Sequence, residues 1–311
     1  MRWLRATAVA ALCLTFVVVV VGAYVRLSDA GLGCPDWPLC YGKAVPGGIA
    51  DGDALARAWK EMGHRYLAGT LGLLLLLLGS LSLKFKRSAG LAFAIVVLVI
   101  FQATLGMWTV TMLLKPAIVT AHLLGGMTIL ALLAWYVLLQ ATHAAAPEAR
   151  ALRASAAAAL AVVGVQIALG GWVSANYAAL ACPDLPLCRG QVAPPMDFAN
   201  AFHVVRELGQ TAEGALLSND ALTAIHWTHR MFALVAAGVV GWAALRALPI
   251  ARSLAIVVLI LLFLQLSLGV ANVGFSLPLP LAAAHNAGAA ALLLALVVLN
   301  FFSFRGLRPS W

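Results

Sequence analysis

Long apolar runs separated by polar segments dominate this chain. Eight of them are long enough to cross a hydrocarbon layer of about 30 Å, for which a helix needs about 20 apolar residues. They cover residues 6–26, 62–83, 89–112, 117–140, 152–174, 222–245, 252–274 and 281–304. The pattern predicts an all-α polytopic membrane protein with eight transmembrane helices. The first run exceeds the apolar region of a signal peptide and lacks a small-residue cleavage site, so we expect it to be retained.

The second half of the chain repeats the first. Residues 33–40 and 181–188 share the pattern Cys-Pro-Asp-x-Pro-Leu-Cys, and polar residues recur in the same order after each copy. The recurring pairs are His64 with His229, Gln102 with Gln265, and His122 with His285. We therefore predict two tandem, pseudo-symmetric four-helix bundles, residues 1–145 and 146–311, each holding a related site.

Composition and charge support a membrane location. Hydrophobic residues make up 63% of the chain and charged residues 10%, against about 25% charged residues in soluble domains. Most basic residues between the spans fall on one side, which the positive-inside rule assigns to the cytoplasm together with both termini. The net charge of +9 then reflects the topology and attraction to lipid headgroups. Nucleic-acid binding is not expected, because the sequence contains no basic patch interleaved with aromatic residues. We predict a multi-pass protein of the bacterial cytoplasmic (inner) membrane.

Four cysteines fall in the two long loops, predicted at 27–60 and 175–221 on the extracytoplasmic, oxidising side, where disulfides persist. Each pair encloses five residues that include two prolines, which favours the bridges Cys34–Cys40 and Cys182–Cys188 over a metal site. Free or redox-cycling thiols remain the alternative. Cys13 stands alone in the first span, where a packing or lipid-facing role is expected.

Four histidines at matching depth are the candidate ligands: His64, His122, His229 and His285. Ionisable residues inside membrane spans are costly and usually face the bundle interior, although an interhelical hydrogen bond is the simpler explanation for any one of them. Two imidazoles that project from opposite helices of a bundle can reach both faces of one iron porphyrin. Each half offers few further ligands for a lone zinc or iron ion.

Other polar residues lie beside these histidines. Glu61 and His226 precede His64 and His229 by one helical turn and so share a helix face with them. Arg65 and Arg230 follow directly, where a guanidinium could hold haem propionates or reach lipid headgroups. These residues, together with Gln102 and Gln265 as expected interhelical hydrogen bonders, complete the candidate set.

The combination of Glu-Met-Gly-His-Arg at 61–65, His-Trp-Thr-His-Arg at 226–230, His122, His285 and both cysteine motifs resembles the haem A synthases. The resemblance covers nearly the whole chain. It implies oxidation of the C8 methyl group of haem O to the formyl group of haem A, for terminal oxidase biogenesis. It also implies a resident haem b on His229 and His285, a substrate haem site at His64 and His122, and catalysis by Glu61. The implied partners are the haem O synthase and cytochrome oxidase assembly factors, and the first cysteine pair would pass reducing equivalents or contact a partner.

Rival functions explain fewer residues. A dihaem b-type electron-transfer protein accounts for the histidines without chemistry on the porphyrin. A quinone-linked thiol oxidase accounts for the cysteines but requires neither the histidine pairs nor Glu61. A transporter fits less well, because the repeats are parallel and their spans are not interrupted near the midplane. The sequence leaves open whether the protein forms a homo-oligomer.

Overall fold

The computed structural model describes residues 2–308, and its main elements are eight long apolar helices. Each is long and apolar enough to cross a membrane, which confirms the predicted multi-pass, all-α fold. The eight are α1 (Arg2–Leu27), α2 (Gly52–Lys84), α3 (Ala89–Thr111), α4 (Pro116–Leu139), α5 (Arg153–Ala175), α7 (Asn219–Ala247), α8 (Arg252–Gly274) and α9 (Leu279–Arg305).

Four short elements complete the described chain. A 3-10 helix, η1 (Pro147–Leu152), leads into α5, and one turn of helix, α6 (Phe198–Ala201), lies in the second long loop. Strand β1 (Ala144–Ala145) pairs antiparallel with β2 (Leu307–Arg308). This pairing joins the linker between the two halves to the residues that follow α9.

Helix α2 begins ten residues before the predicted start of its span, so the predicted loop 27–60 is too long. Asp51 caps the helix because its carboxylate accepts the backbone N–H of Asp53, and Asp53 adds negative charge to the first turn. The first turns are polar and therefore lie outside the apolar run. As a result Glu61 and His64 lie about three turns inside α2 rather than at its end.

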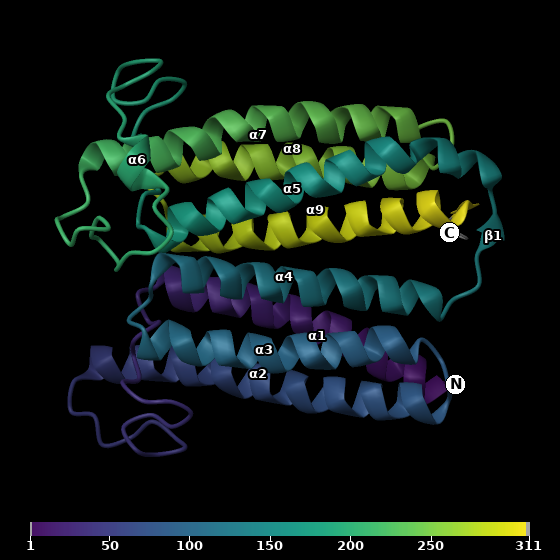
Figure 1. Cartoon of the computed structure of the whole chain (residues 1–311), viewed down its shortest axis with the longest axis horizontal. Coiled ribbons are helices and arrows are strands. Elements are labelled where there is room, and N and C mark those ends of the chain that lie inside the picture. Colours follow the sequence, from purple (N-terminus) through teal and green to yellow (C-terminus); the bar gives the residue numbers. More distant parts are fainter. Residues whose placement is uncertain (1, 309–311) are drawn as a thin grey trace.

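The eight helices form two four-helix groups stacked side by side (Figure 1). Helices α1–α4 form one group, and α5, α7, α8 and α9 form the other. The long loops 28–51 and 176–218 project from one end of the helices, here named the loop end. The chain ends and β1 lie at the opposite, terminal end (Figure 1). Which side of the membrane each end faces stays a prediction.

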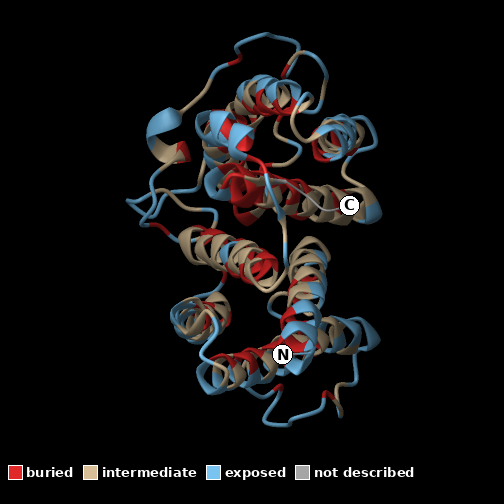
Figure 2. Ribbon diagram, turned by 90° about the vertical axis from the view of Figure 1, so that its right-hand side faces the viewer, coloured by how far each residue is buried: buried red, intermediate tan, exposed pale blue. Residues whose placement is uncertain are grey.

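Helix α9 lies at the centre, because it packs on α5 and α8 of its own group and on α1 and α4 of the other. Buried residues line the faces that the helices turn towards one another (Figure 2). Helices α5 and α7 share an interface rich in small residues, which lets two backbones approach closely inside a membrane. Those residues include Ala156, Ala159, Ala243, Ala244 and Ala247.

Arg26 links the two groups at the loop end. Its guanidinium donates a 2.7 Å hydrogen bond to the carbonyl of Ser174 at the end of α5 and lies 3.9 Å from the ring centroid of Tyr177. A second link is the 2.7 Å ion pair between Lys115 and Glu207, which is largely solvent-exposed and therefore weak. The β1–β2 pair lies at the other end, so contacts beyond helix packing occur at both ends of the bundle.

The central position of α9 predicts where truncation is most costly. Leu296 on α9 is 0% exposed, and its replacement by Ala should lower the free energy of unfolding by about 2–5 kcal/mol through lost contacts and a cavity. Leu264 on α8 is 48% exposed and provides the control, since Leu264→Ala removes the same atoms from the outer surface. Unfolding of the detergent-solubilised variants measures both effects. Equal losses would contradict the central role of α9.

Candidate functional site

The four candidate histidines all lie inside the bundle towards the loop end. His64 is on α2 and His122 on α4, whereas His229 is on α7 and His285 on α9. All four are half-buried. His64 lies close enough to His122 to interact with it electrostatically, and His229 stands in the same relation to His285. The structure therefore brings together one imidazole pair in each half.

In the N-terminal half, each imidazole packs against a glycine of the neighbouring helix. A Cβ atom added to Gly22 on α1 would lie only 2.8 Å from Cε1 of His64. One added to Gly106 on α3 would lie 3.1 Å from Cε1 of His122. Both distances are shorter than a normal carbon–carbon contact of about 3.5–4.0 Å, so the rings occupy space that a side chain would fill.

The same arrangement recurs in the C-terminal half. An added Cβ at Gly170 on α5 would lie 3.1 Å from Cε1 of His229, and one at Gly269 on α8 would lie 3.3 Å from Cε1 of His285. These glycines belong to helices that pack beside the histidine helices. Gly63, on the histidine helix α2 itself, is not packed in this way, since an added Cβ there would meet no atom within 4 Å.

The two predicted glutamines connect neighbouring helices at the histidines. The side-chain amide of Gln102 on α3 donates a 2.6 Å hydrogen bond to the backbone carbonyl of His122. The amide nitrogen of Gln265 on α8 lies 3.4 Å from Nε2 of His285. The expected role of both residues in interhelical hydrogen bonding therefore agrees with their positions.

A third glutamine, Gln166 on α5, was missed. Its amide nitrogen donates to the backbone carbonyl of His229 at 3.1 Å and lies 3.2 Å from Nδ1 of the same residue. Position 18, its counterpart in the first repeat, is valine, so Gln166 is not part of the duplicated pattern. Its spacing could have revealed it, because Gln166 precedes Gly170 by four residues, as Gln102 precedes Gly106.

Glu61 connects α2 to the first cysteine loop. One carboxylate oxygen accepts the backbone N–H of Cys34 at 2.8 Å, and the other accepts a hydrogen bond from Arg65. The side chains of Glu61 and Arg65 are only 5% and 12% exposed. Because both oxygens have partners, the carboxylate is held in one orientation beside the helix face that carries His64.

Arg65 completes this connection. Its guanidinium donates to the backbone carbonyls of Asp36 at 2.9 Å and Leu39 at 2.7 Å while also contacting Glu61. The residue predicted to hold a propionate thus fixes the cysteine loop onto α2. We name this set of contacts, formed by Cys34, Glu61 and Arg65, the first loop clasp.

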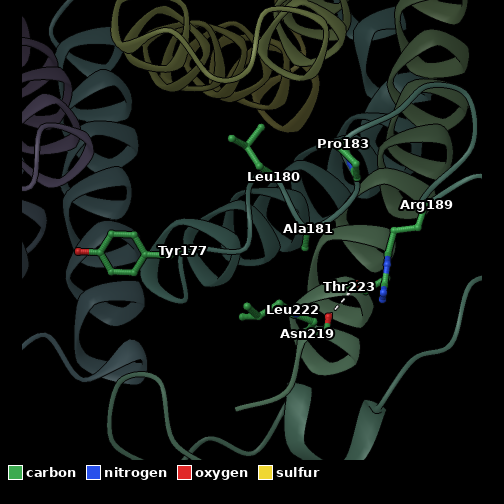
Figure 3. Close-up of a pocket in the computed structure, with 8 residues that line it drawn as sticks. All are labelled: Tyr177, Leu180, Ala181, Pro183, Arg189, Asn219, Leu222 and Thr223. Atoms are coloured by element: carbon green, nitrogen blue, oxygen red, sulfur yellow. Dashed lines mark hydrogen bonds between the residues drawn. The ribbon is translucent and has the colours of Figure 1, made fainter. Parts of the chain in front are cut away.

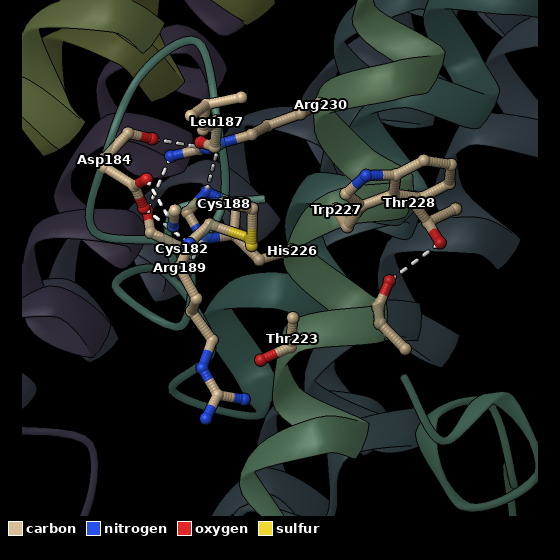
Figure 4. The surroundings of a disulfide bond; sticks show 12 residues. Cys182, Asp184, Leu187, Cys188, Arg189, Thr223, His226, Trp227, Thr228 and Arg230 are labelled. Carbon is tan, nitrogen blue, oxygen red and sulfur yellow. Dashed lines mark hydrogen bonds between the residues drawn. A yellow bond between two sulfur atoms is a disulfide. The ribbon is translucent and has the colours of Figure 1, made fainter. Parts of the chain in front are cut away.

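A second loop clasp, formed by Cys182, His226 and Arg230, occupies the equivalent place in the C-terminal half (Figure 4). Nδ1 of His226 accepts the backbone N–H of Cys182 at 3.2 Å. Arg230 donates to the carbonyls of Cys182 at 2.6 Å, Asp184 at 2.9 Å and Leu187 at 3.0 Å. The two clasps differ mainly in the acceptor, which is a carboxylate in one half and an imidazole in the other.

Aspartates shape the tips of both loops. The Asp36 carboxylate accepts the backbone N–H groups of Gly42 at 2.8 Å and Tyr41 at 2.6 Å. These bonds favour the ionised form, with Gly42 as the larger cause, and so lower the pKa of Asp36. Asp184 makes the same pair of contacts in the second loop, and its pKa is lowered for the same reason.

Both predicted disulfides are present. Cys34 is bonded to Cys40 with an S–S distance of 2.02 Å, and Cys182 to Cys188 at 1.96 Å. Each loop also contains a cis peptide bond, before Pro38 and before Pro186. Cys13 is free and exposed on α1.

A shallow pocket of about 370 Å³ opens beside the second cysteine loop (Figure 3). Its lining includes Tyr177, Pro183, Thr223 and Arg189, and Arg189 forms a 2.8 Å ion pair with Asp220. None of the four candidate histidines lines it. It is therefore separate from the histidine site.

The donor set fits a haem better than a bare metal ion. Within residues 2–308, no group of three or more His, Cys, Asp and Glu side chains could hold a metal ion. Paired imidazoles suit an iron atom that already has four porphyrin nitrogens. The Nδ1 atoms of His64, His122 and His285 are enclosed without a hydrogen-bond partner, yet each residue remains half-buried, as expected for rings that face a ligand space.

The profile of a family described as cytochrome oxidase assembly protein (COX15-CtaA) matches residues 5–297. The chain belongs to this family. A heme A synthase of Shewanella oneidensis is 42% identical over 245 residues, which cover 74% of each chain. A heme A synthase of Symbiobacterium thermophilum is 30% identical over 247 residues, covering 74% of this chain and 76% of its own. One from Alkalihalophilus pseudofirmus is 31% identical over 188 residues, covering 57% of this chain and 62% of its own.

For this member of the cytochrome oxidase assembly protein family, the first loop clasp predicts how the disulfide is protected. Glu61→Ala leaves the Cys34 N–H without its acceptor and removes the carboxylate that pairs with the Arg65 guanidinium, and an uncompensated buried charge is strongly destabilising. The loop should therefore open, and the Cys34–Cys40 bond should react with a water-soluble phosphine faster than in the unaltered protein. Alkylation followed by mass spectrometry measures this rate.

Glu61→Gln is the matched variant, because its amide oxygen can still accept from Cys34. It should show a smaller acceleration than Glu61→Ala. The Cys182–Cys188 bond, held by the second loop clasp, serves as the internal control and should react at an unchanged rate. Equal rates for both Glu61 variants and the unaltered protein would show that the clasp does not protect the loop.

Proposed function

We propose that this chain is a haem A synthase, which oxidises the C8 methyl group of haem O to the formyl group of haem A. Its relatives in the family carry that name. The structural observation that carries the proposal is the presence of one imidazole pair in each duplicated bundle, with an acidic residue beside only one of them. Two haem sites of different chemistry are what such an enzyme requires.

The asymmetry between the loop clasps supports an assignment of roles. In the C-terminal half, residues 146–311, His229 and His285 would hold a resident haem b, and a bound haem b would supply electron transfer. In the N-terminal half, residues 1–145, His64 and His122 would hold the substrate haem O. Glu61 places a carboxylate on the His64 face of α2, whereas the equivalent residue of the second half is the imidazole of His226, which lies between the Cys182 N–H and Arg230.

Glu61 is the proposed catalytic residue. The conversion of a methyl to a formyl group would proceed through two successive two-electron oxidations by an external oxidant, via an alcohol and a geminal diol that loses water. A carboxylate held by Cys34 and Arg65 can stabilise positive charge that develops near the oxidised carbon, or accept a proton from it. Its fixed position means that little reorganisation is needed when charge develops.

The loop clasps also determine what the arginines contribute. Arg65 and Arg230 each donate several hydrogen bonds to backbone carbonyls of the cysteine loops. They would therefore hold the loops over the loop end of each site and exclude water from it. A direct contact with haem propionates stays a prediction. The placement of the cysteine loops on the extracytoplasmic side, and haem O synthase or oxidase assembly factors as partners, also remain proposals.

Pigment analysis tests the proposal. The protein purified from cells that make haem O should yield protohaem together with haem O, its hydroxylated form or haem A. Extraction followed by chromatography and mass spectrometry identifies them. Protohaem alone would favour a dihaem b-type cytochrome, which explains the histidines but not Glu61. Protein without any haem would refute both.

Glu61 should be required for haem A formation but not for the binding of haem O. Glu61→Gln preserves a neutral acceptor for Cys34 but removes the negative charge, so haem O should remain bound while haem A formation falls by at least about a hundredfold, the lower range for a general acid–base group. Haem A produced per bound haem O is the measurement. Normal haem A formation in Glu61→Gln would show that the charge has no catalytic role.

The glycine contacts predict haem retention in the proposed resident site. Gly170→Ala places a methyl group 3.1 Å from His229 Cε1, so the ring must shift and protohaem content should fall. Gly164→Ala on the same helix is the control, since an added Cβ there meets no atom within 4 Å. Haem-to-protein ratios from pyridine haemochrome spectra compare the two. Equal ratios would contradict His229 as a ligand held against Gly170.

A further inference from the structure

Three of the four candidate ligands share a supporting arrangement that the fourth lacks. Helices α3, α5 and α8 each carry a glutamine four residues before the glycine that faces the histidine of the neighbouring helix. These glutamine–glycine pairs are Gln102 with Gly106, Gln166 with Gly170, and Gln265 with Gly269. Four residues correspond to about one helical turn, so each glutamine lies on the same helix face as its glycine.

The glutamine contacts restrain the histidines in addition to steric packing. The amide of Gln102 donates to the backbone carbonyl of His122 at 2.6 Å. Gln166 donates to the carbonyl of His229 at 3.1 Å and places its amide nitrogen 3.2 Å from the ring. A hydrogen bond of this kind fixes the register of the two helices at the ligand itself.

Gln265 and its partner helix show the same close fit. Its amide nitrogen lies 3.4 Å from Nε2 of His285, and a Cβ added to Gly288 on α9 would meet its side-chain oxygen. Gly125 on α4 stands in the same relation to Gln102. On α4 and α9 the histidine helix therefore carries a glycine where the glutamine of the neighbouring helix inserts.

His64 has no such support. Val18 on α1 stands four residues before Gly22, at the place that Gln166 occupies in the second repeat. Among the described residues no side chain hydrogen-bonds to the His64 ring or to its backbone carbonyl, and Nδ1 of His64 is buried without a partner. Only steric contact with Gly22 restrains the imidazole from the α1 side.

We propose that His64 is the exchangeable ligand of the substrate haem, and that Gln102, Gln166 and Gln265 are positioning residues that hold the other three ligands. This inference rests on the proposed function, because it requires a haem between each imidazole pair. A substrate and its product must be exchanged, whereas a resident cofactor must stay. The one unsupported ligand lies in the half proposed to bind the substrate.

Carbon monoxide binding tests this directly and does not depend on turnover. Carbon monoxide binds a ferrous haem with two histidine ligands only after one imidazole leaves the iron. The purified full-length protein, its N-terminal site filled by added protohaem as the probe, is reduced with dithionite and mixed with carbon monoxide. Stopped-flow spectra should show a fast phase from the haem on His64 and His122 and a slow phase from the other haem.

Two reciprocal substitutions, at position 18 of the first repeat and position 166 of the second, should each change the rate of one phase only. Val18→Gln adds a side-chain amide beside His64 and should slow the fast phase. Gln166→Val removes the amide beside His229 and should accelerate the slow phase. The net strength of one hydrogen bond corresponds to a change of about twofold to tenfold in each rate. Val17→Gln is the control, because Val17 is 45% exposed on the outer face of α1, and it should leave both phases unchanged.

The proposal is overturned if Val18→Gln leaves the fast phase unchanged, or if Gln166→Val leaves the slow phase unchanged. It is also overturned if the unaltered protein shows two equal rates. Failure of the proposed function looks different: protein that retains no haem in either half, with or without added protohaem, would show no carbon monoxide spectrum at all.

Discussion

The hydrocarbon layer offers no water to a buried polar group, and the rest of this structure depends on that constraint. Glu61 is tolerated inside α2 because a loop amide and a guanidinium bind both of its oxygens. Near the terminal end, the hydroxyl of Tyr136 meets that of Ser82 at 2.7 Å for the same reason. Around the imidazoles this satisfaction is incomplete, since Nδ1 of His64, His122 and His285 and the side-chain oxygens of Gln102, Gln166 and Gln265 are enclosed without a partner. Unpaired polar atoms therefore gather where the proposed haem ligands lie, although other enclosed polar atoms without a partner occur elsewhere in the described chain.

Duplication produced two sites with the same frame and different chemistry. In both halves an arginine one residue after the histidine binds the carbonyls of a disulfide loop, and the residue three before the histidine accepts a loop N–H. The acceptor is Glu61 in one half and His226 in the other. Because the geometry of the clasp is retained, the change from imidazole to carboxylate adds a charge beside the ligand without altering how the loop is held.

The apolar runs predicted the eight helices well, since crossing a membrane fixes both the length and the composition of a span. The start of α2 was wrong by ten residues because its first turns lie outside the apolar run and depend on the Asp51 cap. The histidines could be identified from the repeat, but their supports could not. Gly22 and Gly170 act across a helix interface, and which helix faces another is a property of packing that one sequence does not show. Gln166 was missed because it has no counterpart in the first repeat. The contacts of Arg65 and Arg230 were missed because their acceptors are backbone carbonyls, which every residue has and which no sequence motif marks.

The links between the two groups restrict how this protein can move. Arg26 ties the end of α1 to the end of α5 near the loops, and the β1–β2 ladder ties the linker to the residues after α9 at the far end. Hinging the two bundles apart would break one or both links and expose the buried faces of α9. Displacing α3, the neighbour of α2 and α4 with no packed contact to the second group, would break neither. A movement of α3 alone would therefore open the first four-helix group towards the lipid while both links between the groups stay in place.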